Sequence, residues 1–157
     1  LFAYKKISKN FKFNIVRFFN VYGYNQNPIF IVSKNIHLAM NKKDLLMYDS
    51  GNQKRCFTFI EDAISALEKL GNIKIYFQIL NIANPKEHSI KKIINLIKKE
   101  SPYNIKIKKI NTKKKYGKSY QDISRRIPSI KNTKKLLNWY PKINVNEGIK
   151  KIINNYE

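Results

Sequence analysis

The sequence is poor in the residues that cross-link a chain or cradle phosphate through backbone amides. It has one cysteine, Cys56, which excludes an intrachain disulfide and makes a reducing, cytoplasmic setting the default expectation. Its five glycines are not clustered, and no strand followed by Gly-x-Gly-x-x-Gly and a helix occurs. The chain alone is therefore not expected to hold a dinucleotide in the usual phosphate-binding loop.

Long apolar runs and acidic residues are also scarce. No apolar run approaches the roughly 18 residues of a membrane span, and no secretory signal is present, so we expect no membrane association. The 32 basic residues outnumber the 10 acidic ones, and the formal net charge is +22. A nucleic-acid partner is the obvious reading of such a charge. We instead predict a solvated lysine-rich surface and no nucleic-acid partner, because no basic stretch carries a nucleic-acid motif.

The high lysine content has a simple compositional explanation. The chain contains 28 lysines, 25 isoleucines and 20 asparagines, which are residues encoded by A- and T-rich codons. Arginine, by contrast, occurs only four times, as Arg17, Arg55, Arg125 and Arg126. Arginine differs from lysine in offering a planar, five-donor fork that grips carboxylates and phosphates in fixed geometry. We therefore expect the arginines to mark positions where an anion is held.

The apolar pattern over the 157 residues predicts one α/β chain. Short strands are predicted at 13–18, 45–48, 56–59, 76–83 and 105–110, and helices at 29–40, 61–70, 90–100, 133–139 and 146–156. The strand at 13–18 is long enough to be buried, and we expect it to belong to a sheet whose other strands are missing, which would leave a bare apolar edge. Gly71 is expected to end a helix as its C′ residue, and residues 111–128 to form a loop. Residues 1–8 resemble the end of a helix, so we expect the chain to be the later part of a longer protein.

Residues 49–55 form the first candidate site. A Gly turn followed by Gln53, Lys54 and Arg55 would bring backbone donors and two cations together, which suits a diphosphate. The alternative is an ordinary hairpin turn with solvated charges. A second candidate is Asn20, just past the predicted strand at 13–18, where ligands of α/β sheets usually lie. Its amide would face a sugar hydroxyl or a phosphate, or would only satisfy the backbone of its loop.

The third candidate is the polar loop from Tyr116 to Ser129. It combines a phenol at Tyr120, a carboxylate at Asp122 and the guanidinium groups of Arg125 and Arg126. Such a loop can grip a ligand and move a proton, or it can be a surface loop with an internal pair between Asp122 and an arginine.

Several other residues are better interpreted as structural than as parts of a site. His37 and His88 have no partners at metal-ligand spacing and are interpreted as structural or exposed. Glu61-Asp62 suits the start of a helix better than an acid/base pair, because adjacent helical residues do not face each other. Trp139 is predicted to anchor the core, and Cys56 to be a small buried side chain rather than a low-pKa thiol.

Together these motifs resemble the extended short-chain dehydrogenase/reductase family of nucleotide-sugar enzymes, and within it the UDP-glucuronate oxidative decarboxylases of lipid A modification and polymyxin resistance. The similar stretches are 17–20, 49–58, 80–85, 116–129 and 137–143. The Asn of the first and the Trp-x-Pro of the last are shared widely in the family. Tyr-Gly-Lys-x-Tyr-Gln-Asp and Gln-Lys-Arg-Cys-Phe-Thr are more specific to the decarboxylases.

The resemblance implies a Rossmann NAD domain followed by a smaller substrate-binding domain. It implies that NAD oxidises C4 of UDP-glucuronate and that the resulting β-keto acid loses CO2, leaving a UDP-4-keto-pentose. The implied substrate-binding residues are Asn20, Leu46, Asp49, Gln53, Lys54, Arg55 and Tyr120. Arg126 matches the arginine proposed as proton donor after CO2 leaves. Electrostatic stabilisation of the enolate is the safer role, because the pKa of a solution guanidinium exceeds about 12.

The family's glycine-rich NAD loop, its Tyr-x-x-x-Lys and its Ser-Glu pair have no counterpart in the sequence. An arginine that the family places after the position of Gly23 is also missing, with Phe30 near that place, and Leu46 and Asn52 replace lysines. We therefore expect residues 1–157 to be the C-terminal substrate-binding portion of such an enzyme, inactive alone. The alternatives are a fragment of a UDP-sugar epimerase or UDP-xylose synthase, or a non-catalytic remnant. A homo-oligomer and an attached formyltransferase domain stay open for the full-length protein.

Overall fold

The computed structural model describes residues 1–7, 10–117, 123 and 125–156. The described helices are α1 (Phe2–Ile7), α2 (Ile31–Met40), α3 (Ile60–Gly71), α4 (Ile90–Glu100), α5 (Thr112–Tyr116), α6 (Lys131–Leu137) and α7 (Val145–Asn154). The described strands are β1 (Ile15–Phe18), β2 (Val21–Tyr22), β3 (Leu45–Tyr48), β4 (Lys54–Cys56), β5 (Thr58–Phe59), β6 (Ile79–Ile82), β7 (Glu87–Ser89) and β8 (Ile107–Ile110).

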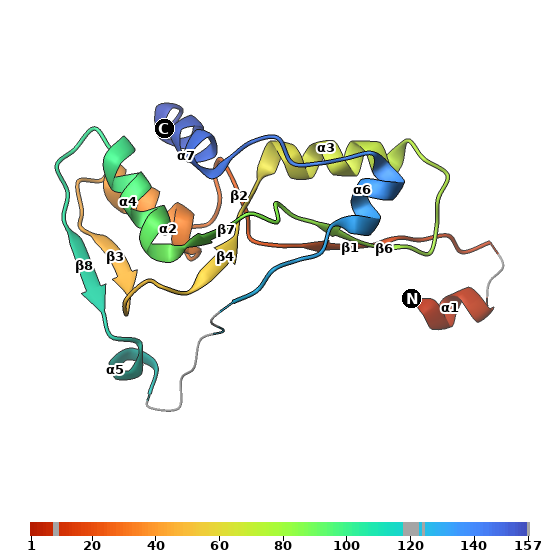
Figure 1. Ribbon diagram of the computed structural model, residues 1–157, viewed down its shortest axis with the longest axis horizontal. Coiled ribbons are helices and arrows are strands. Elements are labelled where there is room, and N and C mark those ends of the chain that lie inside the picture. Colours follow the sequence, from red (N-terminus) through yellow and green to blue (C-terminus); the bar gives the residue numbers. More distant parts are fainter. Residues whose placement is uncertain (8–9, 118–122, 124, 157) are drawn as a thin grey trace.

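The strands pair across long sequence separations. β1 pairs with β6, β2 with β5 and β3 with β8, all in parallel, whereas β4 and β7 are antiparallel. Figure 1 shows β3, β8, α2 and α4 at one end of an elongated molecule, and β1, β6, α3 and α6 toward the other. Parallel pairs need crossover connections, which here are supplied largely by helices. The predicted α/β fold class is confirmed.

The larger part of the core lies where α2, α4 and α7 pack around β3. Helix α4 shows how the sequence builds it: Ile90, Ile93, Ile94 and Ile97 repeat at helical spacing and are all buried. Lysines occupy much of its remaining surface. The hydroxyl of Ser89 accepts a hydrogen bond from the backbone N–H of Lys92 at 3.1 Å, so the predicted Ser89 cap is confirmed.

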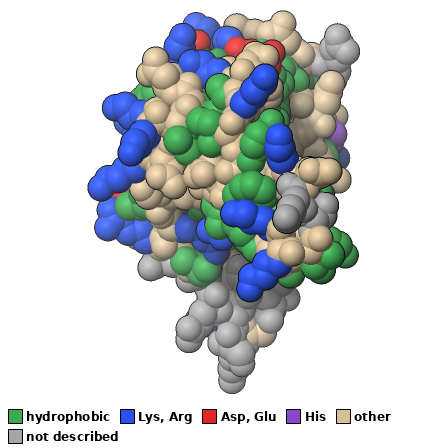
Figure 2. Space-filling view, turned by 90° about the vertical axis from the view of Figure 1, so that its right-hand side faces the viewer, with side chains coloured by type: hydrophobic (Ala, Val, Ile, Leu, Met, Phe, Trp, Pro, Cys, Tyr) green, Lys and Arg blue, Asp and Glu red, His purple; other side chains and the backbone are tan. Residues whose placement is uncertain are grey.

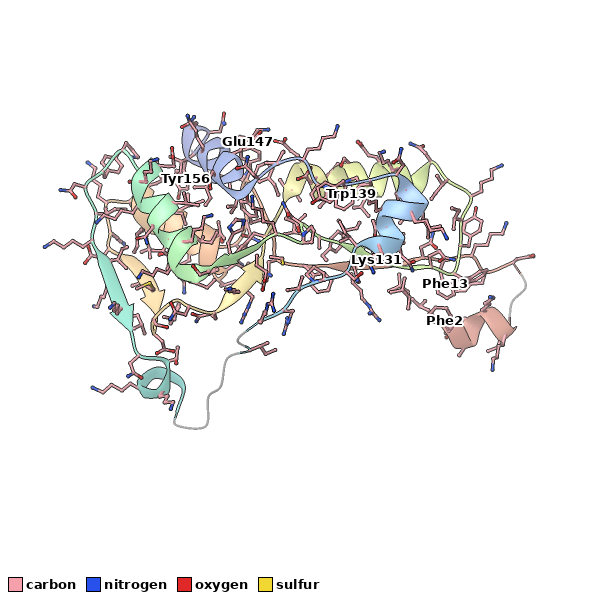
Figure 3. The ribbon with its side chains drawn as sticks, in the orientation of Figure 1. Phe2, Phe13, Lys131, Trp139, Glu147 and Tyr156 are labelled. Atoms are coloured by element: carbon pink, nitrogen blue, oxygen red, sulfur yellow. The ribbon has the colours of Figure 1, made fainter. Side chains whose placement is uncertain are left out.

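A second apolar cluster joins α3, α6 and β6. Trp139, 3% exposed, belongs to it, and its indole Nε1 donates to Ser65 Oγ at 2.9 Å. Figure 3 shows Trp139 beneath α3, in the segment between α6 and α7. The Asp62 carboxylate accepts from the backbone N–H groups of Lys142 and Ile143 at 2.9 and 3.0 Å. The segment between α6 and α7 is thereby tied to the first turn of α3.

Strand β1 pairs only with β6 among the described residues, and Phe18 is 50% exposed, as expected for a strand that leaves a bare apolar edge. Two predictions about local structure were wrong. Gly71 lies inside α3, and Asn72 follows it with a right-handed φ of −86°, so Gly71 is not a left-handed C′ residue. The expected loop after residue 110 begins with a short helix, α5, whose cap is the Asn111 side chain accepting from Lys114 N–H at 3.0 Å.

On one face of the molecule the basic charge is spread out. Figure 2 shows lysine and arginine side chains over this face among hydrophobic ones, with few acidic side chains between them. No single basic patch stands out on that face. Among the helices of the described residues, none has the length and apolar character needed to cross a membrane.

Candidate functional site

A cavity of about 270 Å³ opens near the carboxyl ends of β1, β3 and β8, between α2 and the loop that precedes β4. Polar and apolar side chains share its lining. These are Asn20, Ile29, Ile31, Lys34, Tyr48, Gln53, Arg55, Phe57, Ile90 and Thr112. In parallel α/β sheets, ligands characteristically lie beyond the carboxyl ends of the strands.

Asn20 is held rigidly at the edge of this cavity. It follows β1 with a left-handed φ of +39°, a conformation that asparagine tolerates better than most residues. Its Nδ2 donates to the Cys56 carbonyl at 2.8 Å, and its own carbonyl accepts from Thr58 N–H at 3.2 Å. The amide thus satisfies loop backbone, as one interpretation predicted, and also lines the cavity.

The loop from Asp49 to Gln53 is anchored to the start of α4. Gly51 has φ +67°, and its carbonyl accepts from Lys91 N–H at 2.8 Å. The Gln53 carbonyl accepts from Ile90 N–H at 3.1 Å. The strands on either side pair elsewhere, β3 with β8 and β4 with β7. The interpretation of this segment as a hairpin turn was therefore wrong.

Two cationic side chains give the cavity its positive character. Arg55 comes from β4 and Lys34 from α2, and both are half-buried. The Arg55 Nη1 donates to the Lys54 carbonyl at 2.8 Å, which restrains the side chain. Together with the Gln53 amide, these groups can bind an anion with several oxygen atoms.

Asp49 does not line the cavity but holds a residue that does, Thr112. Its carboxylate accepts hydrogen bonds from both the hydroxyl and the backbone N–H of Thr112, the latter at 2.9 Å. The Thr112 hydroxyl bond, followed by the backbone bond and the charge of Lys113, lowers the pKa of Asp49. The charged carboxylate therefore fixes the position of Thr112, a lining residue.

Arg126 is exposed and is not among the residues that line the cavity. Arg125 donates from Nε and Nη2 to the two carboxylate oxygens of Glu87, both at 2.8 Å. Arg125 also forms a parallel β-bridge with Lys54. Arg126 and Arg55 each follow a member of that bridge by one residue. Because successive residues of extended chains alternate between faces, this register sets Arg126 beside Arg55.

The structure brings some of the predicted site residues to the cavity and leaves others outside it. Asn20, Gln53 and Arg55 line one cavity, although they come from separate elements. Leu46 is half-buried within β3, where its backbone exchanges hydrogen bonds with the Asn35 side chain, and it does not line the cavity. Asp49 acts only through Thr112, as described above. Exposed Lys54 is not among the lining residues. Tyr120 and Asp122 lie outside the described residues.

Lys34, Tyr48 and Thr112 line the cavity but were missed by sequence reasoning. Lys34 follows Ile31 at helical spacing, so both side chains share one face of α2. Tyr48 ends β3, and Thr112 follows the end of its parallel partner β8. The pairing of these strands would have revealed both residues, but it cannot be read from either strand alone.

Other candidate groups have structural surroundings. Cys56 is fully buried, and burial raises the pKa of its thiol to about 11, so the predicted buried cysteine is confirmed. Burial also lowers the pKa of His88, as do Lys92 and Lys86. His37 is exposed and contacts the Tyr156 hydroxyl at 2.7 Å through Nδ1. In the described part of the chain, no cluster of His, Cys, Asp and Glu is suited to a metal ion.

The fold and the cavity define an α/β protein with a partly basic cavity at the carboxyl ends of parallel strands. Residues 2–152 match the family described as GDP-mannose 4,6 dehydratase, and the chain belongs to that family. The resemblance to nucleotide-sugar enzymes of the extended short-chain dehydrogenase/reductase type is confirmed.

Two relatives are similar over most of the chain. The bifunctional polymyxin resistance protein ArnA of Wigglesworthia glossinidia brevipalpis is 37% identical over 94% of this chain and 26% of its own length. The UDP-N-acetyl-alpha-D-glucosaminuronate decarboxylase of Bacillus cytotoxicus is 30% identical over 88% of this chain and 44% of its own. The chain therefore spans less than half the length of either relative.

A solved structure is similar as well. The UDP-glucuronic acid 4-epimerase of Bacillus cereus, in complex with UDP-glucuronic acid and NAD, has a TM-score of 0.80 and 25% identity. The match covers 93% of this chain and 46% of that one. The described residues of this chain do not fit NAD in the usual way, because its glycines lie singly in a turn, at helices or beside packed side chains.

Proposed function

We propose that this chain binds a UDP-linked uronic acid and is the substrate-binding portion of a UDP-glucuronate decarboxylase of the lipid A aminoarabinose pathway. The observation that carries the proposal is the meeting of Asn20, Gln53 and Arg55 in one cavity beside Lys34. The guanidinium and ammonium groups suit the diphosphate, and the amides suit sugar or base hydrogen bonds. The name of the Bacillus cytotoxicus relative supports a UDP-sugar as the ligand.

In this proposal Arg126 acts on the reacting sugar. Loss of CO2 from a β-keto acid leaves an enolate, and a guanidinium close to it lowers the energy of that charge. Its place beside Arg55 would bring it near a ligand whose diphosphate lies on Arg55. We propose stabilisation of the enolate rather than proton transfer, because a guanidinium gives up its proton only in a strongly perturbed site.

Binding of UDP and UDP-glucuronate to this chain tests the proposal, with titration calorimetry or ligand-observed NMR as the measurement. Arg55→Lys should weaken binding of both ligands about tenfold, because lysine cannot replace two directed hydrogen bonds of the guanidinium. Arg17→Lys is the matched control, since Arg17 is exposed on β1 and outside the cavity lining. Equal effects of the two substitutions would refute the assignment of Arg55.

A related epimerase is a second candidate, favoured by the likeness to the Bacillus cereus enzyme. The two reactions differ in whether the carboxyl carbon leaves the sugar. Release of labelled CO2 from carboxyl-labelled UDP-glucuronate by the whole protein would support decarboxylation, and its absence with inversion at C4 would support epimerisation. This chain alone is expected to form no NADH from UDP-glucuronate.

A further inference from the structure

His88 and Arg55 are neighbours in the sheet. Strands β4 and β7 pair antiparallel with Arg55 directly opposite His88. Residues opposite each other in such a pair extend their side chains from the same face, with Cβ atoms about 4.5–5.5 Å apart. Gln53, Arg55 and Phe57 occupy alternating positions and all line the cavity, so this face is the one directed at the cavity. His88 therefore adjoins Arg55 on the cavity side of the two strands, although it is not among the lining residues.

The surroundings of His88 disfavour a positive charge on its imidazole. The residue is 7% exposed, and its buried Nδ1 has no hydrogen-bond partner among the described residues. Arg55 lies opposite it on β4, Lys86 precedes β7, and Lys92 belongs to α4, which packs against β7. Burial first, and then the charges of Lys92 and Lys86, hold the pKa of His88 below its ordinary value of 6.5.

The carboxylate that adjoins His88 in the sequence, Glu87, does not offset these cations. Adjacent residues of a strand alternate between faces, so Glu87 extends from the face opposite His88. Both of its carboxylate oxygens accept hydrogen bonds from Arg125 at 2.8 Å. Lys54, which adjoins Arg55 in β4, lies on that opposite face as well. On the His88 face, the charged side chains that β4, the β7 segment and α4 bring close in the described chain are therefore cations.

An anion held by Arg55 would change this balance. The diphosphate of a UDP-sugar is negatively charged, and an opposite charge close to an ionisable group favours the charged form of that group. No hydrogen bond to Nδ1 fixes the state of the imidazole, so burial and the neighbouring charges decide it. We propose that binding of a UDP-sugar in the cavity is coupled to the uptake of one proton from solvent by His88, which thereby becomes an additional cation of the site. This inference rests on the proposed function.

The direction of the pH dependence follows from linkage. His88 holds a proton less readily in the free chain than in the complex, so the complex gains protons as the pH falls below neutrality. The affinity for the UDP-sugar therefore rises over the same range of pH. His88 acts through its charge beside Arg55 and not by contact with the ligand, since it does not line the cavity. It changes the affinity of the site and takes no part in the chemical step.

The test is titration calorimetry of this chain with UDP-glucuronate between about pH 5.5 and pH 7.5, the range in which histidine ordinarily titrates. Measurement in two buffers with different heats of ionisation gives the number of protons taken up on binding. Both phosphates of UDP-glucuronate are esterified, so the ligand gains no proton there, unlike UDP, whose terminal phosphate has a pKa near about 6. We expect proton uptake that grows toward the acidic end and binding about fivefold tighter there, at the low end of site-to-site coupling.

The two histidines of the chain supply a matched pair of variants. His88→Gln should abolish the proton uptake and flatten the pH dependence of binding. His37→Gln should change neither, because His37 is exposed on α2, contacts Tyr156 and does not line the cavity. The His37→Gln chain also retains a single imidazole, so the NMR signal of His88 can be titrated without His88 being altered. Its midpoint should move to higher pH when UDP-glucuronate is bound.

The outcomes separate this inference from the proposed function. Binding of UDP-glucuronate without proton uptake, or with an unmoved His88 midpoint, overturns the coupling and leaves the UDP-sugar site standing. Proton uptake that persists in His88→Gln overturns the assignment to His88. Failure of UDP-glucuronate to bind at any pH overturns the proposed function and the coupling with it.

Discussion

Arg125 grips Glu87 with two parallel hydrogen bonds, from Nε and Nη2 to the two carboxylate oxygens, both at 2.8 Å. Glu87 belongs to β7, while the backbone of Arg125 bridges to Lys54 of β4. The pair therefore attaches the segment that follows residue 124 to the antiparallel pair of β4 and β7. The register of the bridge brings the backbone of Arg126 alongside that of Arg55, which lines the cavity.

The Arg125–Glu87 pair should make stability depend on pH at the acidic end. The hydrogen bond and charge of Arg125 lower the pKa of Glu87 below its ordinary value of 4.5. A lowered folded-state pKa gives stability that is present above the unfolded pKa and is lost as pH falls through the folded one. Glu87→Gln should therefore flatten the fall in unfolding free energy below a pH of about 4.5.

Denaturant unfolding at a series of pH values measures this effect. Glu68→Gln, which removes an exposed carboxylate on α3, is the control and should leave the acidic slope close to that of the unmodified chain. If Glu87→Gln and the unmodified chain lose stability in parallel from pH 6 to pH 3, the pair has no role in the acid response.

Tyr22 and Gly148 are packed closely together, so substitutions at either residue should change the free energy of unfolding. The Tyr22 hydroxyl is buried with no described hydrogen-bond partner, and burial raises the pKa of that hydroxyl. Tyr22→Phe should stabilise the chain by about 1 kcal/mol, because it removes an unsatisfied polar group. Gly148→Ala should destabilise it by about 1–3 kcal/mol, because the added methyl would overlap the Tyr22 hydroxyl and press on Phe59 at 2.8 Å.

Combining the two substitutions tests the contact directly. The hydroxyl is the atom nearest to the added methyl, so Gly148→Ala should be less harmful in the Tyr22→Phe background. Chemical denaturation of the two single variants and the double variant supplies the cycle. Strict additivity of the two free-energy changes would argue against the contact.

The indole of Trp139 should stabilise the fold through its hydrogen bond as well as through its packing. Trp139→Phe keeps an aromatic ring but removes the bond from Nε1 to Ser65 Oγ at 2.9 Å. We expect a loss of about 1–3 kcal/mol, part from the hydrogen bond and part from the smaller ring. Tyr140→Phe, at a neighbouring side chain that is 54% exposed, should change the free energy of unfolding by less than about 0.5 kcal/mol.

Cys56 should resist modification while the chain is folded. Its side chain is fully buried, and burial and the charge of Glu87 raise the pKa of the thiol to about 11. The reactive thiolate is therefore scarce at pH 8, and a reagent has no access to the sulfur. A disulfide reagent should react slowly in buffer and rapidly in denaturant; rapid stoichiometric reaction of the folded chain would contradict the buried geometry.

Local sequence patterns predicted most elements but not their partners. The isoleucine spacing and the Ser89 cap of α4 are local signals, and both are found in the structure. The exposure of β1 is not a local property, because burial of a strand depends on what packs against it. Phe18 has the same apolar side chain whether its face is covered or, as here, half exposed.

In the candidate site, too, the individual residues could be predicted from the sequence but their grouping could not. Motifs singled out Asn20, Gln53 and Arg55 one by one, and the structure adds that all three line one cavity. Lys34 and Thr112 carried no motif, and they join the cavity because α2 and the β3–β8 pair happen to present them there. Side chains far apart in sequence become neighbours only through strand pairing and helix packing.

By itself, then, the sequence determined the α/β class, the helical spacing of the apolar residues and the few arginines suited to holding anions, because these follow from composition and local periodicity. Only the tertiary structure decided that Arg125 is bound to Glu87 and that Arg55 lines a cavity with Asn20 and Gln53. Those relationships depend on contacts across tens of residues, which no local pattern specifies.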